Sequence, residues 1–406
     1  MQNTILNQEK SSNLSESLRL YAVSDCGGAI EDIKSSIESG VTFFQLREKA
    51  LSFDDFCRKA CAVREFCPPS VPFVINDNLD VALACNADGL HIGQSDGSVR
   101  EARIKLGRDK ILGVSATTVA EAIQAEADGA DYLGVGAVFP TSTKADAAEV
   151  SYNTLRAICL SVKIPVVAIG GISASNLNTL AGSGIKGVAL VSAIYGQKDI
   201  PAAVNKLDSL TKAMVAQPLR GRRAAIVDLD GVVLDSLGTW QEIDRRYLEA
   251  HRLSGRPDIV NRLNNSTTLL DAAVYLHQEC GIEKSPEGIC EEFETLLGDF
   301  YRYELKLMDG ALEALTKLKE KGFSLALATA SSSELAHAAL RRNGAENFFD
   351  HFFCNADKME TTTFYNAIEA LGTGIDETIV FDDLPKIQAK ASSLGFRVYG
   401  ALNELE

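Results

Sequence analysis

The segment Gly40-Val-Thr-Phe-Phe-Gln-Leu-Arg-Glu-Lys49 sets the architecture of the first half of this 406-residue chain. Its β-branched and aromatic residues predict a buried strand. Gln45, Arg47 and Lys49 follow at every second position, and an extended backbone directs such side chains to one side. An amide and two cations at a strand end suit a phosphate or a diphosphate. Taken alone, the segment is equally compatible with a solvated strand end that carries an ordinary Arg–Glu pair.

Seven further apolar segments, separated by helical ones, continue the same alternation along the chain. Continuously apolar strands are typical of parallel sheets that are covered on both faces. Eight of them in about 200 residues predict a (β/α)₈ TIM barrel, and a doubly wound open sheet is the competing architecture. The predicted strands are Leu20–Asp25, Val41–Glu48, Pro72–Asp77, Gly89–Gly93, Ile111–Ala116, Tyr132–Ala137, Val166–Gly171 and Gly187–Ile194. Helices are predicted at Phe53–Phe66, Val119–Ala127 and Asn176–Ala181.

Polar residues follow the predicted strands at their carboxyl ends, where (β/α)₈ barrels carry their active sites. Asp77 and Asp96 follow adjacent strands and can together hold one Mg²⁺ ion. Gly170 and Gly171 end the seventh strand, where a bare backbone can approach a phosphate. Each feature alone also fits a turn or a plain loop, but their common position on one rim favours a site. The other candidate residues on this rim are Asn76, Ser115, Thr141, Thr143, Lys144, Val191 and Ser192.

Five segments resemble those of the thiamine phosphate synthase family, and the resemblance covers residues 18–210. They are Gly40–Lys49, Ile75–Asn78, Gly89–Asp96, Gly134–Lys144 and Val167–Ile172. The resemblance implies an enzyme that joins hydroxymethylpyrimidine diphosphate to a thiazole phosphate and releases pyrophosphate, which is the transfer of an alkyl group. It implies that the pyrimidine diphosphate is contacted by Gln45, Arg47, Lys49, Asn76 and Lys144, with Ser115 near the pyrimidine. It implies that Mg²⁺ is held by Asp77 and Asp96. It also implies that the thiazole phosphate is bound by Thr141, Thr143, Gly171, Val191 and Ser192.

The implied reaction needs charge stabilisation more than acid or base catalysis. Pyrophosphate leaves from a benzylic-type carbon, so Mg²⁺ and the cations Arg47, Lys49 and Lys144 would stabilise the departing group. A related thiazole tautomerase branch is expected to carry a catalytic His after the fifth strand, where this chain has Ser115-Ala-Thr-Thr118. The synthase is therefore favoured, and a barrel with only a binding role is the remaining alternative. Ser24 stands where the family more often has Thr, and the hydroxyl is kept.

Length and composition predict two domains and an ordinary globular protein. The net charge of −15 argues against a nucleic-acid or membrane-surface partner. The first 16 residues lack the apolar region of a signal peptide, and no apolar run is long enough to span a membrane. Among nine cysteines, Cys57 and Cys61 share a helix face and are interpreted as packing residues, not zinc ligands. A reduced, cytoplasmic setting is expected, and homo-oligomerisation stays open.

A second domain is predicted after a linker at 215–223 that contains Pro218, Gly221 and three arginines. The predicted divisions are a polar tail at 1–16, the barrel at 17–214 and the second domain at 224–406. Ala224–Val227 predicts a strand that ends in Asp228-Leu-Asp-Gly-Val-Val-Leu-Asp-Ser236. Carboxylates two residues apart at the end of a buried strand fit a nucleophile beside a cation, with the second carboxylate as acid and base. An EF-hand competes, but the rest of its acidic loop is missing.

The downstream sequence resembles the haloacid dehalogenase superfamily of phosphotransferases over residues 224–406. Predicted strands at Leu325–Ala328 and Thr378–Phe381 end in a hydroxyl cluster and in a pair of aspartates. The resemblance implies a doubly wound sheet with its site at the carboxyl ends of the strands. It also implies a second Mg²⁺ ion in the chain. The implied roles are nucleophile for Asp228, acid and base for Asp230, and phosphate binding for Thr329 and Lys358. Mg²⁺ would be held by Asp228, the Asp230 carbonyl and one or both of Asp382 and Asp383.

A helical cap is predicted at about 237–305 from helical spacing of apolar and aromatic residues, and its histidines His251 and His277 are expected to be structural. The polar segment 258–265 is a weaker candidate for facing the site. Three phosphatase substrates are compatible with a thiamine pathway: thiamine phosphate, which ranks first, pyrophosphate, and a salvaged or damaged phosphate ester. A catalytically idle regulatory or dimerising module is the alternative from another class.

Overall fold

The computed structural model describes residues 13–24, 27–141, 149–219, 221–236, 238–264 and 269–405, with the backbone alone for Trp240 and Asn264. The chain forms two compact units. The first comprises residues 1–222 and 368–377, and the second comprises residues 223–367 and 378–406. No helix within these described ranges is both long and apolar enough to cross a bilayer.

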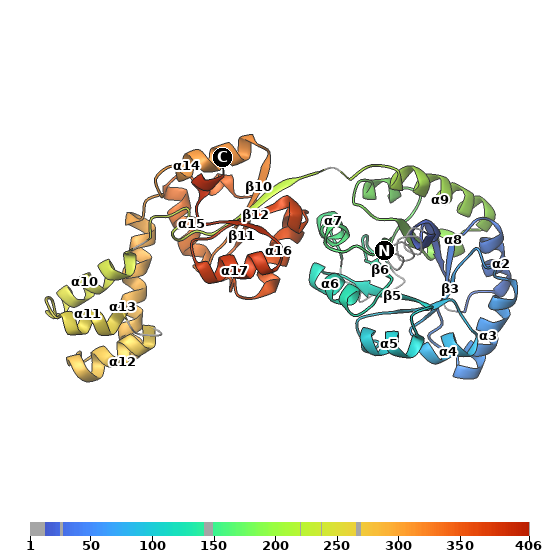
Figure 1. Ribbon diagram of the computed structural model, residues 1–406, viewed down its shortest axis with the longest axis horizontal. Helices are drawn as coiled ribbons and strands as arrows, with labels where there is room; N and C mark the ends of the chain where they lie inside the picture. The colour runs from blue at the N-terminus through green and yellow to red at the C-terminus, as the bar shows by residue number, and fades with distance from the viewer. Residues whose placement is uncertain are drawn as a thin grey trace, which may run out of the picture. The chain divides into compact units, whose positions relative to one another are not determined.

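The first unit is a closed barrel of eight parallel strands in sequential order, which confirms the predicted (β/α)₈ fold (Figure 1). Every strand is fully or almost fully buried, because helices cover the outer face of the barrel and side chains fill its interior. The strands are β1 (Leu20–Val23), β2 (Phe43–Leu46), β3 (Phe73–Asn76), β4 (Gly89–Ile92), β5 (Ile111–Ala116), β6 (Tyr132–Val135), β7 (Val166–Ile169) and β8 (Gly187–Leu190).

Local sequence signals place the barrel helices. The predicted bounds Phe53–Phe66 and Val119–Ala127 are confirmed, because Ser52 and Thr118 cap the two helices with their side chains. Glu121 completes a capping box with Thr118. The helices are α2 (Ile30–Glu38), α3 (Phe53–Phe66), α4 (Leu79–Ala84), α5 (Val99–Leu106), α6 (Val119–Ala127), α7 (Tyr152–Ser161), the 3₁₀ turn η1 (Leu177–Leu180), α8 (Ser192–Tyr195) and α9 (Ile200–Val215).

Two predicted elements were wrong in detail. The strand predicted at Gly187–Ile194 ends at Leu190, and Ser192 begins the short helix α8. The apolar run continues through this turn because Ile194 is also buried, so the hydrophobic pattern does not mark where the strand stops. The helix predicted at Asn176–Ala181 is the single 3₁₀ turn η1.

The second unit is built on a five-stranded parallel sheet in the order β11-β10-β9-β12-β13, which confirms the predicted doubly wound arrangement. Its strands are β9 (Arg223–Val227), β10 (Phe323–Ala328), β11 (His351–Phe353), β12 (Thr378–Phe381) and β13 (Arg397–Tyr399). The helical elements between and after its strands are α14 (Ala311–Glu320), α15 (Ser333–Arg342), η3 (Glu346–Phe348), α16 (Thr361–Leu371), α17 (Pro385–Ser393) and η5 (Leu402–Glu404). The turn η4 (Ile375–Glu377) and the last residues of α16 are grouped with the first unit.

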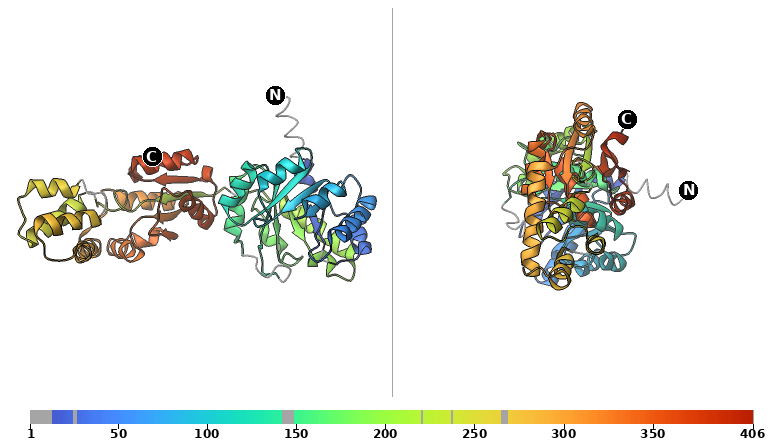
Figure 2. Two further views of the ribbon diagram at one scale, coloured as in Figure 1. Left: turned by 90° about the horizontal axis from the view of Figure 1, so that it is seen from below. Right: turned by 90° about the vertical axis from the view of Figure 1, so that its left-hand side faces the viewer.

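Four helices inserted between β9 and α14 form a lobe of their own within this unit (Figures 1 and 2). They are α10 (Thr239–Ala250), α11 (Pro257–Asn264), α12 (Leu269–Cys280) and α13 (Pro286–Asp299), and α13 runs directly into the π-helical turn η2 (Phe300–Glu304). The two connections to this cap are hydrogen-bonded to each other. Asp235 N donates to Lys306 O at 2.9 Å, and Met308 N donates to Val233 O at 2.9 Å.

Candidate active sites

The carboxyl ends of β2 and β3 bring a lysine and a carboxylate of the first site together. Lys49 pairs with Asp77 Oδ2, and the amide of Asn76 donates to Asp77 Oδ1 at 2.8 Å. Asp77 has a positive φ of 62°, an uncommon conformation for a residue other than glycine. Burial raises the pKa of Asp77, the Lys49 ammonium opposes that shift, and the nearby Asp96 carboxyl adds to it. Two carboxylates and an ammonium therefore share one small region of the rim.

Successive side chains of the segment Gln45–Lys49 point to opposite sides of the backbone, as in an extended chain. Glu48 is buried on the side opposite to Lys49, where its carboxylate pairs with Lys59 Nζ at 2.5 Å and accepts a hydrogen bond from Gly27 N at 3.1 Å. Lys59 also donates to the Gly28 carbonyl at 2.7 Å. Sequence reasoning assigned Glu48 no role. The structure shows that it ties β2 to the loop after β1, which fixes the backbone from which Arg47 and Lys49 project.

Asp96 belongs to the loop after β4, and its side chain is hydrogen-bonded back to the first residue after that strand. Its Oδ2 accepts a hydrogen bond from Gly93 N at 2.8 Å, and a Cβ atom at Gly93 would lie 2.9 Å from the same oxygen. The glycine before Asp96 therefore gives the carboxylate room to approach the rim. On the next strand, the Ser115 hydroxyl lies 3.1 Å from His91 Nε2, and its carbonyl accepts from Gln94 Nε2 at 2.7 Å.

The Gly170-Gly171 pair has a packing role that the sequence did not indicate. Both residues have positive φ, 99° and 63°. A Cβ atom at Gly170 would lie 2.5 Å from Ala137 Cβ, and one at Gly171 would lie 2.7 Å from Phe139 O. The glycines are thus required by the close approach of the loop after β6. Thr141 lies in that loop, Val191 and Ser192 lie at the start of α8, and Thr143 and Lys144 lie outside the described residues.

Sequence reasoning missed three aromatic side chains inside the barrel. Tyr21, His91 and Tyr132 are buried and hydrogen-bonded to one another and to the predicted site residues Gln45 and Ser115. A Cβ atom at Gly113 would overlap the rings of Tyr132 and His91, and one at Gly134 would lie 3.0 Å from His91 Cε1. The signal was present as glycines in the strands β5 and β6, because glycine inside a strand often marks the close approach of another group.

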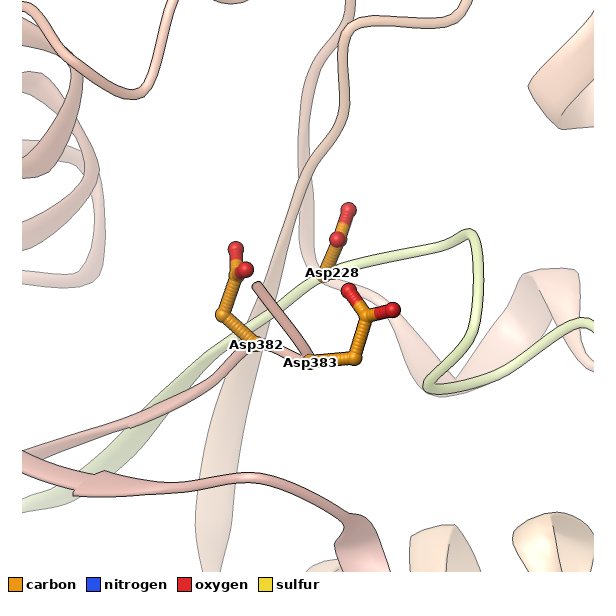
Figure 3. Close-up of side chains that lie close together, drawn as sticks. All are labelled: Asp228, Asp382 and Asp383. Carbon is orange, nitrogen blue, oxygen red and sulfur yellow. The ribbon is translucent and has the colours of Figure 1, made fainter. Parts of the chain in front are cut away.

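The second site lies at the carboxyl ends of β9 and β12. Asp228, Asp382 and Asp383 each offer one oxygen, and these oxygens lie within 4.8 Å of one another (Figure 3). Lys358 is buried between two of them, with Nζ 2.7 Å from Asp228 Oδ2 and 2.5 Å from Asp382 Oδ2. Two of the three carboxylates thus contact the Lys358 ammonium. Burial raises the pKa of Asp228 to about 7 although Lys358 opposes the shift, because removing a carboxylate from water disfavours its charged form.

The glycine of the Asp-Leu-Asp-Gly motif allows this cluster to form. Gly231 has a φ of 79°, and a Cβ atom there would lie 2.5 Å from Asp383 Oδ2. A side chain at position 231 would therefore displace one of the three carboxylates. The strand and the parallel sheet around Asp228 also exclude the EF-hand alternative, which needs two helices flanking the loop.

Two hydroxyl groups hold the Asp230 carboxylate. Tyr301 Oη donates to Oδ1 at 2.5 Å, Ser331 Oγ donates to Oδ2 at 2.9 Å, and the two hydroxyls lie 3.0 Å apart. Ser331 in turn is held by its own backbone N, which donates to Thr329 Oγ1 at 3.0 Å. Tyr301 belongs to η2, at the end of the cap, and sequence reasoning missed it. Burial and the adjacent Asp230 carboxylate raise the pKa of Tyr301, so the phenol stays protonated as a donor.

The two cap histidines, which were expected to be surface or structural residues, contact neighbouring residues of the cap. His251 stacks on Tyr247 with ring centroids 4.4 Å apart, and His277 Nδ1 lies 3.0 Å from the Ile282 carbonyl. In the polar segment 258–265, which lies between these two histidines in the sequence, Asp258 forms an exposed ion pair with Arg256 at 2.7 Å, and residue 265 lies outside the described part.

Comparison with known proteins assigns each unit. Residues 20–194 match the family model for thiamine monophosphate synthase, and residues 225–401 match the model for haloacid dehalogenase-like hydrolases. A thiamine-phosphate synthase of Ruminiclostridium cellulolyticum is 51% identical over 178 residues, 44% of this chain and 85% of the relative. An Oryza sativa protein described as "Probable thiamine biosynthetic bifunctional enzyme, chloroplastic" is 47% identical over 206 residues, 48% of this chain, and this chain spans only 38% of that relative.

A solved structure of a thiamine phosphate pyrophosphorylase from Pyrococcus furiosus is similar to half of this chain. It is 34% identical, covers 50% of this chain and 100% of its own, and has a TM-score of 0.47. Through its first half the chain belongs to the thiamine-phosphate synthase family, and its second half matches the family model for haloacid dehalogenase-like hydrolases.

Proposed function

We propose that the barrel joins hydroxymethylpyrimidine diphosphate to a thiazole phosphate, and that the second unit is a Mg²⁺-dependent phosphatase that acts on thiamine phosphate. The observation that carries the first part is the meeting of Lys49, Asn76, Asp77 and Asp96 on one rim. The observation that carries the second part is the trio of carboxylates around Lys358 at the ends of β9 and β12.

The donor chemistry at both sites fits magnesium. Carboxylate oxygens are the ligands that this ion prefers, and it commonly takes one or two of them with water and substrate oxygens. In the barrel, Asp77 and Asp96 would hold the ion. In the second unit, Asp228, Asp382 and Asp383 would hold it, with the Asp230 carbonyl as a further candidate. When bound, the ion supplies positive charge to phosphate oxygens and offsets the repulsion among these carboxylates.

In the barrel, this chain's residues would bind the diphosphate as a leaving group. Arg47 and Lys49 project from the end of β2, and Lys144 is the third proposed cation. The carbon–oxygen bond to the diphosphate breaks, and the thiazole nitrogen then supplies the electron pair of the new carbon–nitrogen bond. Preorganised cations lower the energy of the charge that develops on the leaving oxygens. Thr141, Thr143, Gly171, Val191 and Ser192 are proposed to position the thiazole phosphate for attack.

In the second unit, Asp228 would attack phosphorus while Asp230 donates a proton to the leaving oxygen. The aspartyl phosphate is then hydrolysed by a water molecule from which Asp230 removes a proton, which restores the Asp228 carboxylate and the protonated Asp230. Lys358 and Thr329 are the proposed phosphate ligands. The hydroxyls of Tyr301 and Ser331 orient the acid and base, because they hold both of its oxygens. Thiamine phosphate is the proposed substrate, since a capped site accepts a bulky organic phosphate and since the barrel would produce this compound.

The substrate assignment is tested by phosphate release from the full-length protein, offered thiamine phosphate, pyrophosphate or a sugar phosphate in separate reactions. The proposal predicts that thiamine phosphate is turned over fastest. Equal slow turnover of all three would contradict a dedicated substrate, and preference for pyrophosphate would support the alternative that the domain draws the condensation forward. Asp228→Asn should abolish phosphate release. If the Asp228→Asn and wild-type proteins released phosphate at the same rate, the second unit would instead be interpreted as a regulatory module.

The cysteines favour a reducing compartment such as the cytoplasm. Eight cysteines fall within the described ranges, and all eight are free thiols.

A further inference from the structure

An unbroken chain of side-chain hydrogen bonds crosses the interior of the barrel between two proposed pyrimidine ligands. It begins at Gln45 on β2 and passes through Tyr21 on β1, Tyr132 on β6 and His91 on β4 to Ser115 on β5. Gln45 Nε2 donates to Tyr21 Oη, the two phenol oxygens are 2.8 Å apart, Tyr132 Oη is 2.9 Å from His91 Nδ1, and His91 Nε2 is 3.1 Å from Ser115 Oγ.

All members of this chain except Ser115 are buried, with at most 8% of their surface exposed. The barrel makes specific room for them, because a side chain at Gly113 would occupy the space of the Tyr132 and His91 rings. Burial raises the pKa of both phenols, so each keeps its single proton. Each phenol can therefore donate one hydrogen bond and no more.

The donor in the first hydrogen bond of this chain then determines which group donates in each of the following ones. The Gln45 amide nitrogen can only donate, so Tyr21 accepts from it. Either phenol could be the donor in the contact between them, but only donation from Tyr21 to Tyr132 gives the buried Tyr21 proton an acceptor among these side chains. Tyr132 then donates to His91 Nδ1, which makes His91 the tautomer that carries its proton on Nε2. That proton goes to Ser115 Oγ and leaves the hydroxyl hydrogen of Ser115 available to a ligand. At the other end, the carbonyl oxygen of Gln45 is left as an acceptor.

We propose that this chain makes Ser115 a hydrogen-bond donor and Gln45 a hydrogen-bond acceptor toward the substrate, with Tyr21, Tyr132 and His91 as positioning residues. The Gln45 carbonyl and the Ser115 hydroxyl together select a heterocycle that offers an N–H donor and a ring-nitrogen acceptor, as an amino-substituted pyrimidine does. The reversed chain, with every proton shifted to the opposite partner, would present the wrong group at both ends. The inference rests on the proposed role of Gln45 and Ser115 at the pyrimidine.

The test is the tautomer of His91, read by ¹⁵N NMR on full-length protein labelled at its five histidines and assigned with a His91→Gln variant. The wild type is expected to carry the proton on Nε2, and a proton on Nδ1 would overturn the proposal. Gln45→Glu replaces the donor by an acceptor at the far end of the chain, so His91 should switch to the Nδ1 tautomer. An unchanged tautomer in a folded Gln45→Glu protein would overturn the proposal as well.

Gln94→Glu is the matched control, because Gln94 also donates at this rim but to the Ser115 carbonyl, outside the chain. It should leave the His91 tautomer unchanged. The tautomer is read without turnover, so a failure of the proposed condensation is seen separately, as absence of activity in the wild type.

A kinetic arm tests selectivity. Tyr132→Phe should lower kcat/KM for the amino-substituted pyrimidine diphosphate about tenfold, the effect of one lost hydrogen bond. It should lower kcat/KM much less for an analogue that lacks the amino group. Equal losses for both substrates would assign Tyr132 a structural role only and overturn the proposal. Tyr152→Phe, which removes a phenol bound to the Ala181 carbonyl in the outer layer, should change neither value.

Discussion

Replacing Asp228 by Asn should stabilise the second unit when magnesium is absent. The substitution reduces the cluster from three carboxylates to two, and Lys358 keeps its 2.5 Å contact with Asp382. Burial raises the pKa of Asp228 from 3.8 to about 7, a difference of about three units, and each unit is worth about 1.4 kcal/mol. The charged carboxylate therefore costs the folded state about 4 kcal/mol at pH 8. Because the new amide would place a second donor near Lys358, we expect a net gain of about 1–2 kcal/mol.

The pH dependence follows from the direction of that pKa shift. Between pH 4 and pH 7 the folded protein holds a proton on Asp228 that the unfolded chain has released, so wild-type stability falls as pH rises through this window. The Asn variant has no such group. The excess of its free energy of unfolding over that of the wild type should therefore be small near pH 4, grow up to about pH 7 and stay constant at higher pH.

The assay is urea unfolding in EDTA, followed by the fluorescence of Trp240. This residue is the single tryptophan of the chain and lies in α10, so its signal reports the second unit. Asp235→Asn is the matched control, because Asp235 belongs to the same motif but is exposed. Magnesium at a hundred times its Kd should add about 2.7 kcal/mol to the wild type and much less to the Asn variant. An Asn variant no more stable than the wild type at pH 8, or an equal advantage at pH 5 and pH 8, would refute the reasoning.

Three further predictions concern single side chains. Lys49→Met should lower the condensation rate by about 10²–10³, because a cation at the leaving group is lost, and should leave the phosphatase activity unchanged. Steady-state assays of both reactions test this, and equal losses in the two activities would argue against separate sites. Tyr301→Phe should lower the phosphatase kcat about tenfold at an unchanged KM, because Asp230 loses one of the two hydroxyls that orient it, whereas a changed KM alone would mean that Tyr301 acts on binding. Gly113→Ala should destabilise the barrel by about 1–3 kcal/mol by overpacking against Tyr132, measured by thermal unfolding in far-UV circular dichroism, and an unaltered midpoint would contradict the crowded interior.

The barrel and the rim pair Lys49–Asp77 were accessible from sequence, because apolar strands and the period of two fix which side chains leave the same strand end. The acidic cluster of the second unit was accessible for the same reason, since parallel strands bring Asp228, Asp382 and Asp383 to one edge of the sheet.

Two side-chain contacts between elements far apart in the sequence were not predicted. His91 meets Tyr132 across 41 positions, and Tyr301 meets Asp230 across 71. The apolar pattern marks neither pair, because His91 and Tyr132 in strands and Tyr301 in η2 have the same periodicity as any buried apolar residue. Only the glycines of β5 and β6 were a signal for the first pair. The end of β8 was misjudged for a related reason, since burial of Ile194 continued the apolar run past the strand.

The most direct test of the barrel's chemistry is pyrophosphate release from hydroxymethylpyrimidine diphosphate by the full-length Asp228→Asn protein, in which the proposed phosphatase cannot consume the product. We predict release at the wild-type condensation rate that requires both the thiazole phosphate and Mg²⁺, and its loss when Asp77→Asn is added. Release that does not depend on the thiazole phosphate, or that survives Asp77→Asn, would contradict a condensation centred on this rim.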